Sequence, residues 1–408
     1  MNESWVYYAV ANRLGGAKFE QCLGYKFERI KQAKRDFLAK HPYVKLLDFG
    51  IGEPLDVPPH TVVQALKATC GQAEYNGYAD NGADFFTESV QRYMQKTLNV
   101  ELGKNEILPI LGIKSGLTLL AGALINPGDW VAYTQPGYGV FATQTQYWGG
   151  NVYALTLTPE RQFLPDLEAI PEPIKHKIKI LSLNYPNNPT GSVATTAFYK
   201  HVVEMALRYH WIVVQDAAYT ALSFEDPLSI FQIPHAKDCC IELHSMSKGF
   251  NMTGWRLGWL CGNEVIVKAC STYKNHCDSG QFLAIQKAAC AGLDNAQAWL
   301  PQLRQKYQQR LIRLADILQK HHFKVYQPAA GFFLYVAAPL SVSSKTNGRA
   351  ILFKTAEDFS QWFLDTLGIS VVPWEANGPY VRFSVTFKTS DEETYFSELQ
   401  NRLAKFSF

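Results

Sequence analysis

Several features that would place this chain in a particular class are missing from its sequence. It has no run of about eighteen uninterrupted apolar residues, which a membrane span requires, so we expect no membrane-spanning helix. The start, MNESWVYYAVANRLGG, lacks a basic segment followed by an apolar run and predicts no signal peptide. Lys and Arg number 39 against 36 Asp and Glu. With no basic run among them, we expect no nucleic-acid partner.

Cysteine and histidine are present, but not in metal-binding patterns. The eight cysteines include no C-x-x-C pair and the ten histidines no H-E-x-x-H motif. We therefore expect no structural zinc and assign no metal ligand. Scattered cysteines without a leader segment are typical of reduced thiols, so a cytoplasmic protein is expected. No period of about 20–50 residues repeats, which argues against a solenoid.

What the sequence does contain is the pattern of an α/β protein. It has 408 residues, of which 47% are hydrophobic and 18% charged, as is ordinary for a globular chain with a large core. Short apolar runs alternate with amphipathic helices, and continuous runs are typical of strands covered on both faces. The runs are Ile107–Leu111, Trp130–Tyr133, Lys179–Leu183 and Trp211–Val214. They predict a large, mixed and mostly parallel sheet.

The order of the elements predicts a large and a small domain. A long helix is expected from Pro301 to His321, because apolar residues recur there at spacings of three or four. It leads to a C-terminal unit of strands and a helix. We expect residues 1–58 to form an N-terminal arm and part of the small α+β domain. Residues 59–300 are then the large domain, and 301–408 complete the small one.

The stretch HSMSKGFNMTGWRLGW, from His244 to Trp259, is the strongest candidate for a chemical site. A lysine among serines is usually a solvated surface residue, but Lys248 is flanked by apolar residues on both sides. Burial lowers the pKa of a lysine, as a Schiff-base lysine requires. Ser245 and Arg256 add a hydroxyl and a fork-shaped cation, which suit a doubly charged phosphate.

Three further segments lie at predicted element ends. Asp216 ends an apolar strand, where open α/β sheets place ligands. It is either a helix-capping aspartate or the partner of a protonated ring nitrogen, with Tyr219 facing the same pocket. Asn188, in the turn NYPNNPTG, offers an amide to a phenolic oxygen, although turn chemistry alone explains such residues. The segment Leu111–Leu117 precedes a helix whose backbone N–H groups suit a phosphate.

Together these segments resemble the class I aminotransferases of pyridoxal-phosphate fold type I. The S-x-S-K-x-x-x-x-T-G-W-R block, the D-x-x-Y pair and the N-N-P-T-G turn occur in the order of that family. The resemblance runs from about residue 48 to about residue 388. It implies pyridoxal 5'-phosphate as cofactor, an amino acid and a 2-oxo acid as substrates, and ping-pong transfer of the amino group.

The resemblance also implies a role for each matching residue. Lys248 corresponds to the Schiff-base lysine and general base, and Asp216 to the partner of the pyridine nitrogen. The other cofactor positions are Tyr219 and Asn188 at the ring oxygen, Ser245, Arg256 and the backbone of Ile113 and Lys114 at the phosphate, and Tyr138 stacked on the ring. Arg382 matches the arginine that binds the substrate α-carboxylate. The resemblance also implies that Gly52 and Asn188 lie beside that carboxylate.

A second subunit is implied by one tyrosine. Tyr78 resembles the residue that reaches the phosphate of the neighbouring subunit, so the resemblance implies a homodimer with shared active sites. The interval from Tyr78 to Gly82 is one residue shorter than in many relatives, and Tyr75 is therefore the alternative.

The substrate is predicted from similarities in shorter segments of the sequence. The segment KNHCDSGQF has no arginine where aspartate aminotransferases carry one from the second subunit, although Lys274 offers a substitute cation. GYKFERIK, PGYGVF and PWEANGPYVRFSVTF look, together with the motifs above, like a bacterial LL-diaminopimelate aminotransferase lineage. That activity serves lysine and peptidoglycan biosynthesis, with 2-oxoglutarate as amino acceptor. Asp80 then either faces the distal ammonium of this substrate or is a turn residue of YADNG.

Other functions remain open at this point. An aspartate, alanine or aromatic aminotransferase, or a C–S β-lyase, would share every cofactor residue. A non-catalytic binding protein on the same fold is a further alternative, and the presence of Lys248 argues against it. The reactivity of Cys277, close to the candidate pocket in sequence, is left undecided.

Overall fold

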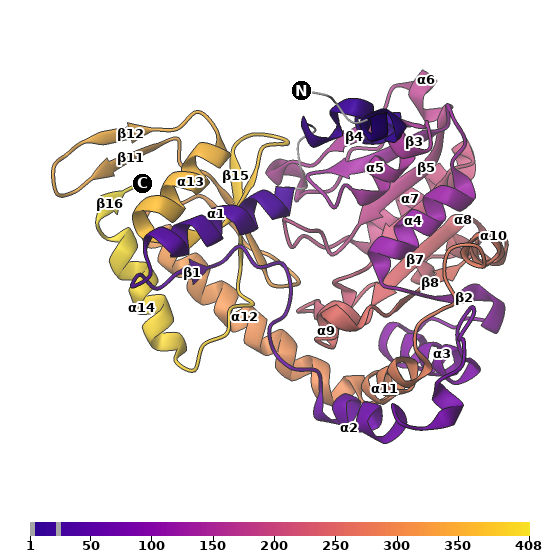
Figure 1. The fold of residues 1–408 in the computed structure, drawn as a ribbon. Coiled ribbons are helices and arrows are strands. Elements are labelled where there is room, and N and C mark those ends of the chain that lie inside the picture. The colour runs from indigo at the N-terminus through magenta and orange to yellow at the C-terminus, as the bar shows by residue number, and fades with distance from the viewer. Residues whose placement is uncertain (1–4, 22–25) are drawn as a thin grey trace.

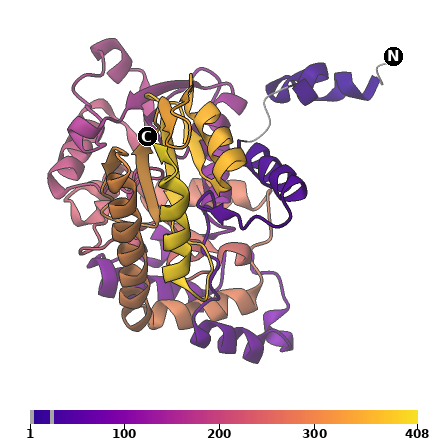
Figure 2. The same ribbon diagram turned by 90° about the vertical axis from the view of Figure 1, so that its left-hand side faces the viewer.

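The structure is a computed structural model that describes residues 5–21 and 26–408. Gly24 and Tyr25, in the GYKFERIK segment, lie outside these ranges. Within them, no helix is both long and apolar enough to cross a bilayer. Figure 2 shows the segment with the 3-10 helices η1 (Trp5–Ala9), η2 (Asn12–Leu14) and η3 (Gly16–Gln21) standing apart from the rest of the chain.

A seven-stranded sheet organises the larger part of the molecule (Figure 1). Its strands are β2 (Ile107–Ile110), β3 (Trp130–Gln135), β4 (Asn151–Thr156), β5 (Ile178–Asn184), β6 (Ile212–Asp216), β7 (Cys240–Ser245) and β8 (Gly258–Gly262). Their order is β2-β8-β7-β6-β5-β3-β4, and β8 alone runs in the direction opposite to the other strands. The predicted mixed, mostly parallel sheet is therefore confirmed.

Helices cover both faces of this sheet, which explains the continuous apolar runs. Ile180 and Val214 pack in a cluster with leucines of α4 (Ile113–Leu124). Their neighbours Leu181 and Val213 pack in a different cluster, with valines of α7 (Thr196–Tyr209). Successive residues of a strand point to opposite faces, so both positions must be apolar when both faces are buried. The remaining helices beside this sheet are α5 (Val140–Tyr147), α6 (Glu172–Lys175), α8 (Ala236–Cys239), α9 (Met246–Gly249) and α10 (Glu264–Lys274).

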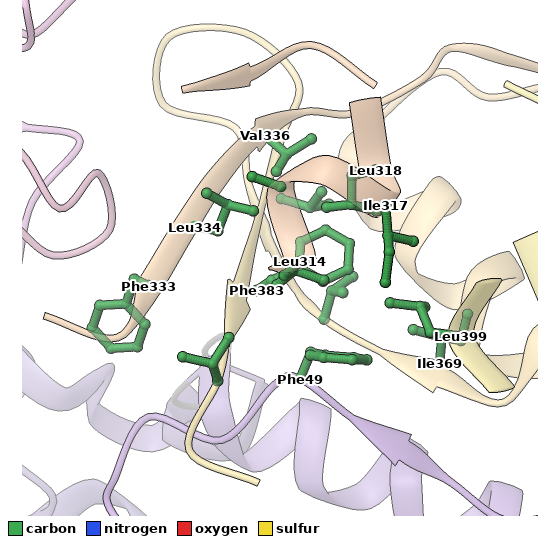
Figure 3. Close-up of a cluster of buried hydrophobic side chains, with 14 of the residues drawn as sticks. Phe49, Leu314, Ile317, Leu318, Phe333, Leu334, Val336, Ile369, Phe383 and Leu399 are labelled. Atoms are coloured by element: carbon green, nitrogen blue, oxygen red, sulfur yellow. The ribbon is translucent and has the colours of Figure 1, made fainter. Parts of the chain in front are cut away.

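The smaller part is built from both ends of the chain. Its strands are β1 (Leu47–Asp48), β9 (Val325–Tyr326), β10 (Phe333–Ala337), β11 (Ser341–Ser344), β12 (Ala350–Leu352), β13 (Ile369–Ser370), β14 (Val372–Trp374), β15 (Tyr380–Ser384) and β16 (Phe406–Ser407). Its helices are α1 (Lys26–Lys40), α13 (Ala356–Leu367) and α14 (Glu392–Leu403). β1 pairs with β13, and Phe49 is buried among side chains of β10, β15 and α14 (Figure 3).

Helix α12 (Ala296–Lys320) joins the two parts and begins earlier than predicted. Pro301 lies inside this helix, where it removes one backbone hydrogen bond. Ala296 and Leu300 are buried against the larger part, and this packing favours the extra turn. Helices α2 (His60–Thr69), α3 (Asp84–Leu98) and α11 (Leu283–Asp294) complete the larger part. We propose domain boundaries near residues 58 and 300 on this basis.

Candidate active site

A cavity of about 380 Å³ opens at the carboxyl end of the parallel strands. Its size is that of a small-molecule site. It is lined by these residues singled out in the sequence: Gly52, Ile113, Lys114, Tyr138, Asn188, Asp216, Tyr219, Ser245, Lys248, Arg256 and Arg382. Asn184, at the end of β5, is paired in register with Asp216 at the end of β6. Parallel strands bring their carboxyl ends to one edge, so segments distant in sequence meet there.

Lys248 lies on α9, directly after β7, with its amine inside the cavity. Its Nζ donates a hydrogen bond of 2.8 Å to the carbonyl oxygen of Gly52. The pKa of Lys248 is lowered to about 8, chiefly by desolvation. The cations of Arg382 and Arg256 act in the same direction, while the carboxylates of Glu53 and Asp216 act against it. An appreciable neutral fraction of this amine therefore exists near neutral pH, as a nucleophile or base requires.

Asp216 is a buried carboxylate at the end of β6. Its Oδ1 accepts a 3.1 Å hydrogen bond from the backbone N–H of Ala218, so a local turn uses one oxygen. Burial raises the pKa of Asp216 to about 7, against the lowering effect of this hydrogen bond, His244 and Lys248. Such a carboxyl is stabilised as an anion by a cation placed against it. The 3-10 helix that follows begins only at Thr220, so Asp216 is not its N-cap.

Backbone and side-chain groups at one end of the cavity suit a phosphate. Gly112 precedes α4 with φ of 80°, and a Cβ there would lie 2.5 Å from Nη2 of Arg256. The missing side chain thus lets the guanidinium approach the helix N-terminus, where backbone N–H groups and the helix dipole attract anions. Nη1 of Arg256 donates to the carbonyl of Thr253 at 2.7 Å. The hydroxyl of Ser245 caps α9 by accepting from the N–H of Ser247 at 3.0 Å.

A buried arginine from the smaller part of the molecule also lines the cavity. Arg382 lies on β15 and is 1% exposed. Its Nη1 donates to Oδ1 of Asn188 at 2.8 Å, and its guanidinium carbon lies 4.0 Å from the ring centroid of Phe333. A Cβ on Gly52 would lie 3.3 Å from Nη2. The planar cation is held in place by these contacts, and its fork geometry suits a carboxylate.

Two tyrosines complete the wall. Tyr219 is buried, which raises the pKa of its phenol, and it packs edge-on against Phe332 and Phe333. A neutral phenol of this kind donates a hydrogen bond. Tyr138 follows β3 and is half-buried at the cavity. An aromatic side chain at this position suits a planar ligand.

Two of the residues singled out in the sequence do not reach this cavity. The side chain of Tyr78 is 86% exposed, and Asp80 is exposed in a turn with φ of 46°. Tyr75 is half-buried and packs against Phe85 at 6.3 Å between ring centroids. Within one chain Asp80 is thus a turn residue, and both Tyr78 and Asp80 would need a second subunit to meet a site. Cys277 also lies outside the cavity lining, with its thiol donating to the carbonyl of Tyr273 at 3.4 Å.

Lys274 is not the substitute cation that the sequence allowed. It is 1% exposed and donates to Oδ1 of Asp278 at 2.6 Å and to the carbonyl of Asp80 at 2.8 Å. These bonds hold two loops together and bury the charge, so Lys274 is unavailable to a substrate.

Several lining residues had no role predicted from the sequence, among them Phe27, Lys31 and Glu53. Phe27 and Lys31 come from α1, and Glu53 directly follows Gly52. Nothing local to α1 marks it as part of a site, because its position depends on how the two parts of the molecule pack. Glu53 had a usable signal, since it adjoins a residue already assigned to the cavity.

Comparison with known proteins agrees with this geometry. A family model described as aminotransferase class I and II matches residues 44–396. An LL-diaminopimelate aminotransferase from Methanocaldococcus jannaschii is 46% identical over 394 residues, which covers 96% of this chain and 93% of that protein. One from Methanococcus maripaludis is 38% identical over 100% of this chain and 99% of its own length.

Solved structures show the same fold. Substrate-bound BacF from Bacillus subtilis has a TM-score of 0.86 at 28% identity and covers 96% of this chain and 97% of its own. A double mutant of Thermus thermophilus aspartate aminotransferase has a TM-score of 0.85, covering 96% and 99%, and at 22% identity it bears on the fold alone. The predicted fold type I and aminotransferase activity are confirmed, and the chain belongs to the class I and II aminotransferases.

Proposed function

We propose that this aminotransferase uses pyridoxal 5'-phosphate to transfer an amino group from LL-2,6-diaminopimelate to 2-oxoglutarate, in lysine and peptidoglycan biosynthesis. The observation that carries the cofactor assignment is the convergence of Lys248, Asp216 and Arg382 on one cavity. The substrate assignment rests on the activity named for the relatives at 46% and 38% identity. We propose a cytoplasmic location as well.

The groups around the cavity match the cofactor part by part. Lys248 offers an amine of lowered pKa to its aldehyde, and the buried carboxylate of Asp216 offers an anion to its ring nitrogen. The N-terminus of α4 with Ser245 and Arg256 suits its phosphate. The other contacts are the amide of Asn188 and the phenol of Tyr219 for the ring oxygen, and the ring of Tyr138 for stacking.

In amino transfer, the cofactor supplies some of the reacting groups and side chains of this protein supply the others. When bound, pyridoxal phosphate supplies an electrophilic carbon for the substrate amine and a ring that withdraws electrons from its Cα. Lys248 Nζ, neutral in part near pH 8, takes the Cα proton and returns it as general base and acid. Arg382 orients the substrate by its α-carboxylate. Asp216 as an anion favours a protonated ring nitrogen.

We further propose a homodimer with shared active sites. Tyr78 and Asp80 lie on an exposed segment outside the cavity of their own chain. In a two-fold assembly this segment would supply a phenol to the partner's phosphate and a carboxylate to the distal ammonium of its substrate. A monomer in analytical ultracentrifugation would contradict this proposal.

Single-turnover absorbance spectra of the purified enzyme test the function. LL-diaminopimelate, L-aspartate, L-alanine and L-tyrosine are added separately, and we expect diaminopimelate to convert the pyridoxal band to that of pyridoxamine phosphate fastest. Conversion by another amino acid alone would retain the aminotransferase and reject the substrate. Absence of any pyridoxal band would reject the cofactor assignment.

The buried charge of Asp216 predicts a pH-dependent stability in the cofactor-free protein. Because burial raises its pKa from 3.8 to about 7, the folded state keeps a proton that the unfolded chain releases above about pH 4. Stability is then lost as the pH rises through this window. Asp216→Asn removes the loss, so we expect it to unfold at higher temperature than the wild type at pH 8, with a gain on the order of 2–4 kcal/mol. The gain should vanish at pH 4.

Thermal unfolding at both pH values measures this effect. Asp316→Asn, at an exposed position of α12, is the matched control and should show no such pH dependence. Equal stability of Asp216→Asn and wild type at pH 8 would contradict the prediction.

A further inference from the structure

Two charged residues of the cavity have no task in the proposed chemistry. Lys248, Asp216, Arg256 and Arg382 are all assigned to cofactor or α-carboxylate, and Lys114 is the second residue of α4, the helix whose N-terminus is assigned to the phosphate. The remaining two are Lys31 and Glu53. They have opposite charge, which is the complement of a zwitterion.

Both lie on segments that flank Arg382 rather than the phosphate end. The ring of Phe27 is 5.6 Å from the guanidinium carbon of Arg382, and Lys31 follows Phe27 by one helical turn on the same face of α1. One turn advances about 5.4 Å along the axis. Glu53 adjoins Gly52, which also approaches Arg382. In Figure 1 the first turn of α1 points towards the part that carries the large sheet.

Neither charge is held in a buried ion pair, although Glu53 acts on the charge of Lys248 and raises its pKa. Lys31 Nζ lies 3.0 Å from Oε1 of Glu28, but the two side chains are 58% and 59% exposed. An exposed pair of this kind contributes little and is easily exchanged for another partner. In the part of the chain that the structure describes, Glu53 has no ion-pair partner within 4.0 Å.

We propose that Lys31 binds the distal carboxylate of both substrates and that Glu53 binds the distal ammonium of the amino donor. The inference rests on the proposed diaminopimelate activity. Diaminopimelate carries a carboxylate and an ammonium at its far end, whereas 2-oxoglutarate and glutamate carry the carboxylate alone. Lys31 therefore serves both half-reactions and Glu53 only one. An ammonium has three N–H donors, so Glu53 and Asp80 of the partner subunit can share it.

Direct binding of unreactive acids tests Lys31 without catalysis. Glutarate has two carboxylates and butyrate one, and calorimetry on the holoenzyme measures both. Lys31→Met should weaken glutarate about tenfold and leave butyrate unchanged. The difference should shrink in 1 M salt, because the site is partly exposed. Equal affinity of Lys31→Met and wild type for glutarate would overturn the proposal for Lys31, and so would an equal loss for butyrate.

Half-reaction kinetics separate the two residues. Lys31→Met should raise KM about tenfold for diaminopimelate and for glutamate with little change in kcat. Glu53→Gln should raise KM for diaminopimelate alone. A rise of equal size for glutamate, or no rise for diaminopimelate, would overturn the role of Glu53.

Two control variants exclude indirect effects. Glu28→Gln removes the ion pair of Lys31 but keeps the cation, and Lys40→Met removes an exposed cation from the far end of the same helix. Both should behave as the wild type. A wild-type enzyme that converts another amino acid but not diaminopimelate rejects the proposed substrate instead, while the glutarate titration still reports on Lys31.

Discussion

Replacing Lys248 by alanine is expected to lower kcat for amino transfer by at least about 10⁴-fold. A positioned general base contributes about 10²–10⁴-fold, and loss of the covalent anchor for the cofactor adds to this. The fold should survive, because the removed amine makes one side-chain hydrogen bond, to Gly52, and burial disfavours its charged form. Steady-state rates measure the effect.

Three controls make this result specific to the amine of Lys248. Borohydride reduction of the wild type should attach the cofactor mass to the peptide that contains Lys248. Added methylamine should restore part of the rate in Lys248→Ala by supplying a base. Lys268→Ala, at an exposed position of α10, should keep full activity. Labelling of a different lysine, or wild-type rates in Lys248→Ala, would refute the assignment.

The second large effect is expected for Arg382→Lys. This change keeps the positive charge but removes the fork that binds a carboxylate with two parallel hydrogen bonds. Arg382 is 1% exposed, and a lysine there also leaves Oδ1 of Asn188 without its present donor. We expect kcat/KM for amino acids to fall about 100-fold, which corresponds to about 2.8 kcal/mol.

The loss should depend on the substrate carboxylate. With a simple aliphatic amine as donor, Arg382→Lys and wild type should react at similar low rates. Arg310→Lys is the matched control, since Arg310 is 4% exposed but binds Glu392 and the carbonyl of Val385 away from the cavity. It should affect stability without discriminating between the two donors. An equal loss for amine and amino acid in Arg382→Lys would show a structural role instead.

Much of the cavity was predictable because its residues lie at element ends. Asp216 closes β6, Ser245 closes β7, and Lys114 lies in the first turn of α4. In a parallel sheet these ends share one edge. Arg382 was found only through resemblance to a family, since a lone arginine in a strand carries no local signal for a ligand.

The amino-acid sequence by itself determined the sheet, the helices that cover it and the strand-end positions of Asp216, Ser245 and Lys248 in the cavity. It did so because apolar periodicity and strand-end motifs are local properties of the chain. Only the tertiary structure decided that Lys274 is buried in a structural ion pair, that Phe27 and Lys31 line the cavity, and that Tyr78 and Asp80 lie outside it. These outcomes depend on how α1 and the loops pack against distant segments, and burial and proximity of that kind leave no trace in local sequence patterns.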